Sequence, residues 1–148
     1  MPTIFDDRER RRIHRRIDAL TPHAPRRWGR MTAHQMVCHL IDSVESAFDD
    51  EAEAPGTGPL SRQPLKWLVL NVLPWPRGTM QSPERLTRRH PADWAGDVAA
   101  LHAALDRLAA RAPGAPWPAS EVFGTLSRHE WGALLRAHIH HHLRQFGA

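Results

Sequence analysis

Apolar residues recur at helical spacing in several segments of the chain, and prolines separate these segments. The spacing predicts long helices over residues 5–20, 32–49, 91–111 and 127–147, and a short apolar helix over residues 65–73. The sequence nowhere sustains the alternation of apolar and polar residues that is typical of β-strands. Because proline cannot continue a helix, the 13 prolines limit where each helix can run. The pattern predicts an all-α fold.

Two of the expected helices have well-marked starts. Thr32 is followed three residues later by Gln35, and Ser127 by Glu130, which is the spacing of a capping box. Proline is favoured in a first turn, so we expect the third long helix to begin near Pro91 to Asp93. Residues 50–64 are rich in proline and glycine and are expected to form a loop. About 40 residues separate the second and third long helices. We therefore predict one domain over residues 1–148, a four-helix bundle with a long crossover between helices 2 and 3.

The composition limits the class of protein. A chain of 148 residues with 41% hydrophobic and 24% charged residues fits one ordinary globular domain. The single cysteine, Cys38, cannot form an internal disulfide, so we expect a reducing, cytoplasmic location. The longest apolar run, residues 67–73, is too short to cross a membrane, and the charged N-terminus does not resemble a signal peptide. We expect no membrane partner.

Positive charge gathers at the N-terminus. Residues 1–30 hold nine of the 20 basic residues, all of them arginine, and four of the 16 acidic ones, so the rest of the chain is nearly neutral. Such a cluster is one mark of a nucleic-acid interface. It lacks the stacking aromatics and groove-reading motifs of known interfaces. We expect a solvated helix face and no specific nucleic-acid partner.

The strongest chemical signal lies among the 11 histidines. His138 and His142 are four residues apart, so they share one helix face, and that face continues the apolar stripe of Trp131 and Leu135. Two imidazoles can converge on one ion, and imidazole suits zinc, nickel, copper or iron. The alternative is two partly buried histidines that bond to neighbouring carbonyl groups.

A catalytic metal commonly has three protein ligands, so a third ligand would come from another helix. The 32–49 helix offers His34 and His39, which are about 140° apart around its axis and cannot both point into one site. His39 is expected at the edge of the core, whereas His34 is expected to be exposed and without a role. Cys38 is a ligand by type, but a lone cysteine in a helix is more often a small core residue.

Four stretches of the sequence resemble the DinB/YfiT-like metalloenzyme superfamily. They are residues 28–40 (WGRMTAHQMVCHL), 74–78 (PWPRG), 123–127 (FGTLS) and 138–147 (HIHHHLRQFG). The similarity covers residues 26–147, and the last stretch is its most specific part. More narrowly, the chain resembles a branch of the superfamily whose members mostly have no assigned function.

The resemblance implies a four-helix bundle with a long crossover and a three-histidine metal site. Matched position by position, the ligands are His39, His138 and His142, and we expect zinc or nickel. Activities known in the family include thiol transfer and isomerisation with low-molecular-weight thiols such as bacillithiol, mycothiol or glutathione. The sequence departs from the family at His140, where an acidic or polar residue is more usual.

The expected function is a metal-dependent enzyme that transfers a low-molecular-weight thiol to a small electrophile, or catalyses a related hydrolysis or isomerisation. No catalytic residue is assigned, and Asp42, His141 and Gln145 are candidates to orient the ligand imidazoles. Two alternatives stay open. One is a non-catalytic bundle that serves as a binding or stress-associated module, with a structural metal or none. The other is a nucleic-acid binder that acts through the arginine-rich first helix.

Aromatic residues in or near the crossover have three interpretations. Trp67, Trp75 and Trp117 could cover a pocket above the metal, or they could bury the interface of a homodimer. Ordinary core packing is the alternative.

Overall fold

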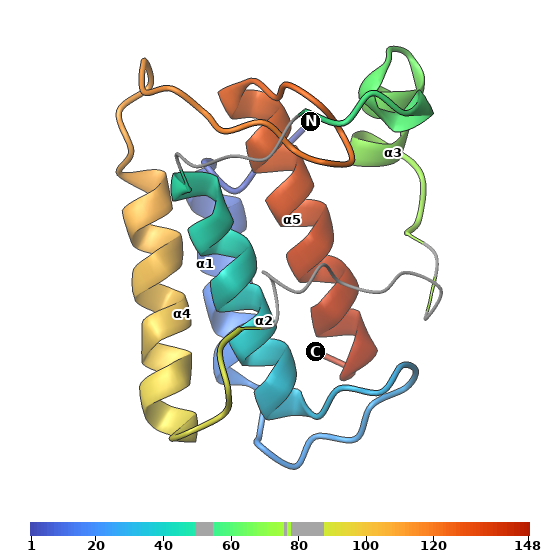
Figure 1. The fold of residues 1–148 in the computed structure, drawn as a ribbon. Helices are drawn as coiled ribbons and strands as arrows, with labels where there is room; N and C mark the ends of the chain where they lie inside the picture. Colours follow the sequence, from blue (N-terminus) through green and yellow to red (C-terminus); the bar gives the residue numbers. More distant parts are fainter. Residues whose placement is uncertain (50–54, 76, 78–87) are drawn as a thin grey trace.

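The computed structural model describes residues 1–49, 55–75, 77 and 88–148. Every regular element named within these residues is a helix, which confirms the all-α prediction. The long helices are α1 (Asp7–Asp18), α2 (Ala33–Glu45), α4 (Trp94–Ala109) and α5 (Arg128–Gln145) (Figure 1). The short elements are α3 (Leu65–Asn71) and the 3-10 turns η1 (Ser46–Phe48) and η2 (Pro59–Ser61). No helix in this described part is long and apolar enough to cross a membrane.

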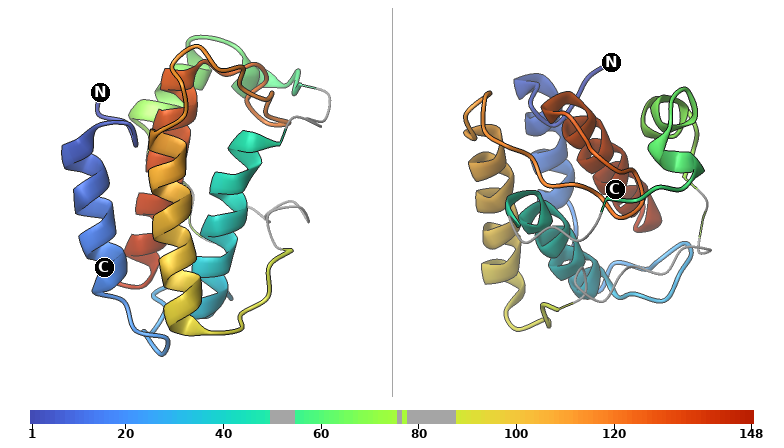
Figure 2. Two further views of the ribbon diagram at one scale, coloured as in Figure 1. Left: turned by 90° about the vertical axis from the view of Figure 1, so that its left-hand side faces the viewer. Right: turned by 45° about the horizontal axis from the view of Figure 1, so that its top comes forward.

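The four long helices enclose the core. Both α2 and α1 pack against α4 and α5, so that α1 and α2 lie across the core from each other (Figures 1 and 2). Aliphatic side chains from all four helices fill the space between them and are almost completely removed from solvent; they include Ile13, Ile17, Met36, Leu40, Leu105 and Leu143. The burial of these stripes holds the helices that carry the histidines in place.

Both predicted capping boxes are present. The Thr32 side chain accepts a hydrogen bond from the backbone N–H of Gln35, and the Gln35 side chain accepts one from the backbone N–H of Thr32. Ser127 and Glu130 make the same reciprocal pair at the start of α5. Each pair satisfies two N–H groups that a helix start would otherwise leave without a partner. The starts of α2 and α5 were therefore predictable from the sequence.

Other boundaries differ from the prediction. α4 begins at Trp94, because the Asp93 carboxylate accepts the N–H of Gly96 at 2.7 Å and acts as the N-cap. The helix thus begins one residue after the expected start at residues 91–93, and Pro91 precedes it instead of lying in its first turn. The expected second helix changes into the 3-10 turn η1 over its last residues, and η2 forms inside the expected loop 50–64.

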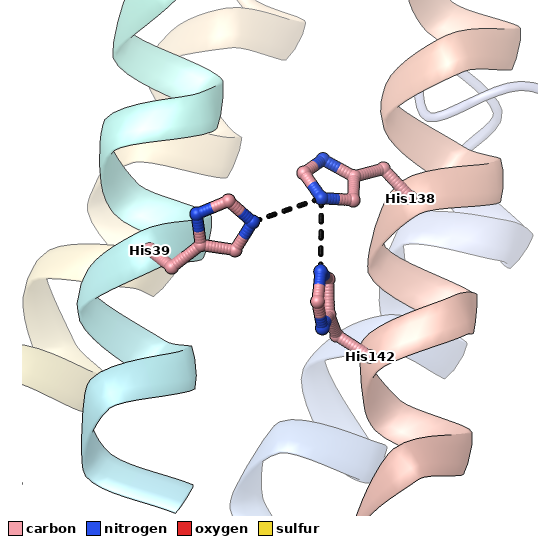
Figure 3. Close-up of side chains that lie close together, drawn as sticks. All are labelled: His39, His138 and His142. Carbon is pink, nitrogen blue, oxygen red and sulfur yellow. Dashed lines mark hydrogen bonds between the residues drawn. The ribbon is translucent and has the colours of Figure 1, made fainter. Parts of the chain in front are cut away.

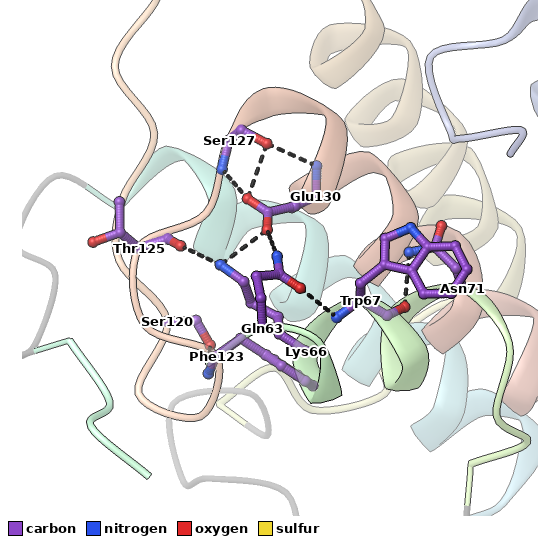
Figure 4. Close-up of polar contacts among 9 residues, drawn as sticks. All are labelled: Gln63, Lys66, Trp67, Asn71, Ser120, Phe123, Thr125, Ser127 and Glu130. Atoms are coloured by element: carbon purple, nitrogen blue, oxygen red, sulfur yellow. Dashed lines mark hydrogen bonds and ion pairs between the residues drawn. The ribbon is translucent and has the colours of Figure 1, made fainter. Parts of the chain in front are cut away.

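A buried lysine holds α3 against the N-terminal end of α5 (Figure 4). The Lys66 ammonium donates to the carbonyl oxygen of Thr125 at 3.0 Å and lies 2.9 Å from the Glu130 carboxylate. The Gln63 amide donates to the same carboxylate, and its oxygen accepts the backbone N–H of Trp67. These contacts attach α3, which lies between α2 and α4 in the chain, to the helix that carries two of the candidate ligands.

Candidate metal centre

Three imidazoles from two helices meet between α2 and α5 (Figure 3). His39 lies on α2, and His138 and His142 lie one turn apart on α5. The Nε2 atom of His138 is 3.0 Å from the Nε2 atom of His39 and 3.0 Å from that of His142. The structure therefore brings together the three residues that the resemblance matched by position. Their ligand atoms all lie within 4.8 Å of one another, so the group could hold a metal ion.

Trp75 covers the most exposed of the three rings. His39 and His142 are buried, whereas His138 is partly exposed. The indole ring of Trp75 stacks on the His138 imidazole, with ring centroids 5.6 Å apart and planes at 22°. The indole N–H donates to the carbonyl oxygen of Val69 at 3.2 Å, which fixes the ring to α3. Trp75, which follows α3, thus shields one face of the candidate centre.

The other two tryptophans have different surroundings. Trp117 is partly buried and lies edge-on to Phe5, with ring centroids 5.7 Å apart, and near Trp131. It therefore packs against the core. Trp67 is 50% exposed.

Gln145 orients the His142 ring. Its amide nitrogen donates to the carbonyl oxygen of Trp28 at 2.7 Å, so its amide oxygen faces the Nδ1 atom of His142, 2.9 Å away. The Nδ1 atom then carries the ring proton, and the Nε2 lone pair points at the other histidines. Gly29 makes this approach feasible, because its φ is +78° and a Cβ atom there would collide with the Gln145 amide nitrogen.

Three neutral imidazoles have too few available N–H groups to make an ordinary hydrogen bond at each of these two contacts. Each neutral ring has one N–H, and the proton of His142 is already committed to Gln145. If the Nε2 atom of His138 carries the ring proton, that one proton must serve both 3.0 Å contacts. If it does not, its lone pair faces the lone pair of His142. A cation placed among the three nitrogens would accept all three lone pairs. The donor set fits a metal ion on this observation.

Burial keeps the rings of α5 neutral. It lowers the pKa of His138 well below the usual 6.5, and His142 and His39 lower that pKa further. Burial also lowers the pKa of His142 to about 3, although the bond to Gln145 acts in the opposite direction. Neutral imidazoles keep the lone pairs that a metal needs, so both side chains are ready to bind one at neutral pH.

The two remaining candidates for orienting the imidazoles differ in placement. His141 lies edge-on to His142, with ring centroids 5.2 Å apart, and edge-on to Trp28. The Asp42 carboxylate accepts the backbone N–H of Arg89 at 2.9 Å, so it connects α2 to the segment before α4. The direct hydrogen bond to a ligand ring described above comes from Gln145.

A second group of ligand-type side chains lies between α2 and α4. The Asp97 carboxylate accepts a hydrogen bond from the Nε2 atom of His34 at 2.7 Å, and the thiol of Cys38 lies 3.8 Å from the same oxygen. The expectation that His34 is exposed and without a role was therefore wrong, whereas Cys38 is buried as expected. Burial, and then the Asp97 carboxylate, raise the pKa of Cys38 to about 11, so its thiol is protonated and is not an activated nucleophile at neutral pH.

The arginine-rich helix α1 is solvated over only part of its surface. Exposed arginines cover its outer face: Arg8, Arg11, Arg12 and Arg15. Its inner face carries Glu9, which is buried and bonds to Arg136 and His140 of α5. The expected solvated face is thus accompanied by a buried ionic contact that was not predicted from the sequence.

Comparisons with known proteins leave the family untested. No protein-family model, curated protein or solved structure matches the chain. Of the stretches that carry the resemblance, residues 76 and 78 lie outside the described residues. The interpretation of the site therefore depends on its own geometry and chemistry.

Proposed function

We propose that the chain is a DinB-like metalloenzyme, a four-helix bundle with a long crossover that binds a divalent transition-metal ion through His39, His138 and His142. The convergence of the three Nε2 atoms, with two separations of 3.0 Å, carries the proposal. Two nitrogens bound to one tetrahedral zinc at about 2.0–2.1 Å are about 3.3 Å apart, so small side-chain shifts would admit the ion. Zinc or nickel suits three imidazoles.

The proposed activity is transfer of a low-molecular-weight thiol to a small electrophile, or a related hydrolysis or isomerisation. A divalent ion held by three neutral ligands keeps its charge and lowers the pKa of a bound thiol or water, which supplies a nucleophile near neutral pH. Three protein ligands leave room for a substrate atom. This donor set favours catalysis over a closed structural site, in which four protein ligands are usual.

Residues around the histidines prepare the site for this chemistry. Gln145 holds the proton of His142 on Nδ1, so that Nε2 is available to the ion. Trp75 covers one face of His138 and excludes water from it. Burial of His39 and His142 lowers the local dielectric constant, which strengthens the effect of the positive charge on a bound substrate.

Metal analysis of protein purified without a metal-affinity step tests the site. We expect zinc or nickel to copurify, and the variants His39→Ala, His138→Ala and His142→Ala each to weaken binding at the site by more than about 100-fold, since changes outside the ligand shell already cost about 10- to 100-fold. His129→Ala removes an exposed histidine of the same helix and should leave affinity unchanged. Full metal affinity in His39→Ala would show that the ligand assignment is wrong.

An activity screen tests the chemistry separately. Metal-loaded protein should accelerate conjugation of bacillithiol, mycothiol, glutathione or cysteine with at least one halo-aromatic, epoxide or maleyl acceptor, or hydrolysis of an ester or amide. Chelation and His138→Ala should both abolish the rate, with His129→Ala as the control. Inactivity throughout, together with a fourth protein ligand on the metal, would replace the enzyme proposal with a structural module.

A further inference from the structure

The group formed by His34, Cys38 and Asp97 has the ligand arrangement of a metal site. His34 and Cys38 lie one turn apart on α2, and Asp97 projects from the first turn of the neighbouring helix α4. Their ligand atoms all lie within 4.8 Å of one another. This is the plan of the three-histidine centre, in which one helix supplies two ligands at i and i+4 and a packed neighbour supplies the third.

The distances are close to those of a coordinated ion. Ligand atoms bound to one tetrahedral zinc, at about 2.0–2.1 Å for nitrogen or oxygen and about 2.3 Å for sulfur, are about 3.3–3.6 Å apart. The His34 Nε2 atom and the Cys38 Sγ atom lie 2.7 Å and 3.8 Å from the same oxygen of Asp97. The sulfur–oxygen separation is close to that of a coordinated pair, and the shorter nitrogen–oxygen separation would have to widen by rotation of the His34 or Asp97 side chain.

Neighbouring groups hold two of the three side chains. The backbone N–H of Ala92 donates to the Asp97 carboxylate at 3.2 Å, and the Trp94 ring packs edge-on against His34 with centroids 5.4 Å apart. Such contacts orient ligands in metal sites. Cys38 is 1% exposed, whereas the side chains of His34 and Asp97 are 18% and 11% exposed, so an ion would enter from the side of the imidazole and carboxylate.

The charges distinguish this group from the three-histidine centre. One thiolate and one carboxylate neutralise a divalent ion, whereas three imidazoles leave its charge uncompensated. A neutral ion–ligand set is better suited to a nearly buried position, because isolated charge is costly to bury. The thiolate also favours soft, thiophilic ions such as zinc and cadmium.

We propose that His34, Cys38 and Asp97 form a second divalent-metal site, separate from the three-histidine centre, that binds zinc or a softer ion and attaches α4 to α2. On binding, the Cys38 S–H bond breaks, its proton goes to solvent, and a sulfur–metal bond forms. The proton on Nε2 of His34 that now bonds to Asp97 is released, and Nδ1 takes up or keeps the one proton of the neutral ring, so that Nε2 and the carboxylate oxygen both bind the ion. The site does not depend on the proposed enzymatic function.

Titration of the metal-free full chain with cadmium tests the proposal. Because Cys38 is the sole cysteine of the sequence, a thiolate-to-cadmium charge-transfer band in the near ultraviolet reports this site, and the sulfur-free histidine centre gives no such band. We expect a saturable band whose amplitude corresponds to one thiolate-bound cadmium per chain and which excess zinc removes. No band at saturating cadmium in the folded wild-type protein would overturn the proposal, whatever the variants do.

Variants show which residues share the ion. Cys38→Ser should abolish the band, and His34→Gln and Asp97→Asn should each weaken cadmium binding by at least about tenfold. His23→Gln, which changes an exposed histidine outside both groups, should have no effect. A band of unchanged affinity in both His34→Gln and Asp97→Asn would mean that a lone thiol binds cadmium, which contradicts the proposal.

The double variant His39→Ala/His142→Ala separates this inference from the proposed function. It removes two ligands of the histidine centre and should keep the cadmium band with unchanged affinity. Loss of the band in this variant, with α-helical circular dichroism retained, would show that the two groups are one site and would refute their separation. Failure of the histidine centre to bind metal would leave the band in place.

Discussion

Gln145 connects the metal centre to the loop that precedes α2. Its backbone carbonyl oxygen accepts the N–H of Arg27 at 2.7 Å, and its side-chain amide joins the carbonyl oxygen of Trp28 to the His142 ring. The residue is only 3% exposed. Both ends of the amide are therefore fixed, and the ring that it orients has little freedom to rotate.

The variant Gln145→Met tests this connection. Methionine has a similar length but no amide, so the Nδ1 proton of His142 loses its acceptor and the ring can change tautomer or rotate. We expect metal affinity at the three-histidine centre to fall by about 10- to 100-fold, the usual effect of losing such a partner. Isothermal titration with zinc measures it in the Cys38→Ser background, where sulfur does not compete.

One further substitution serves as a control for this prediction, and another tests it independently. Arg144→Met changes an exposed neighbour on the same turn and should leave affinity unchanged. Gly29→Ala should act in the same direction as Gln145→Met, because its Cβ atom would displace the amide and its φ of +78° is strained for alanine. Equal zinc affinity of Gln145→Met and the parent protein would mean that packing alone orients His142.

The three-histidine group was predicted from the sequence, whereas the group of His34, Cys38 and Asp97 was not. The spacing of His138 and His142 indicated a shared face, and the resemblance added His39. A signal for the second group was nevertheless present, because Asp97 lies four residues before Leu101 on the buried stripe of α4. A charged residue on an apolar stripe must find a partner across a helix interface, and which partner it finds depends on packing that the sequence does not contain.

The same signal was present in α1. The apolar residues at helical spacing in and beside this helix, Ile4, Ile13, Ile17 and Leu20, are all buried. Glu9 lies one turn before Ile13, on the same stripe, and the structure pairs it with α5. Periodicity thus located the helix and its inner face, but the ionic contact on that face required the position of α5.

We expect the loss of the Glu9 contact between α1 and α5 to lower the stability of the protein. Burial raises the pKa of Glu9, but the bonds and charges of His140 and Arg136 outweigh burial and leave that pKa below its usual value of 4.5. Glu9→Gln should lower the free energy of unfolding by about 2 kcal/mol, because it removes the charge from one buried and one partly buried hydrogen bond. Urea denaturation at pH 7 measures the loss.

An exposed arginine of the same helix serves as the control. Arg11→Gln should change stability by less than about 0.5 kcal/mol, as surface substitutions usually do. If the two variants lose equal stability, the contact between α1 and α5 has no special role. Neither variant should create or remove specific binding to duplex or single-stranded nucleic acid, which we expect to be absent at physiological salt.

At the scale of the whole molecule, α2 is the helix that both candidate sites share. It packs against α5 on one side, where His39 lies, and against α4 on another, where His34 and Cys38 lie. Ions at the two sites would therefore attach both neighbours to α2. Both sites need deprotonated ligands, so the stability of the molecule and its capacity for metal should depend on pH in the same sense.

Buried histidines should make the metal-free protein less stable as the pH falls. The folded-state pKa of His142 is about 3, and those of His138, His140 and His141 are also lowered, with burial as the first cause in each case. The unfolded chain, with histidine pKa values near 6.5, therefore binds more protons than the folded chain below about pH 7, so stability rises with pH in this range. Carboxylates with lowered pKa, such as Glu9 and Asp97, act in the same direction only below about pH 5.

Denaturation between pH 8 and pH 5 isolates the histidine contribution. Taking the pKa of His142 as about 3 when folded and about 6.5 when unfolded, this residue alone should cost the metal-free protein about 2 kcal/mol of unfolding free energy between these pH values. Urea denaturation with a chelator present should show at least this loss in the wild-type protein, and His142→Gln should remove about 2 kcal/mol of it. The exposed His23→Gln should leave the difference between the two pH values unchanged. Equal stability of the wild-type protein at pH 8 and pH 5 would mean that the site histidines are protonated without cost, which is incompatible with three buried, neutral rings that are ready to bind an ion.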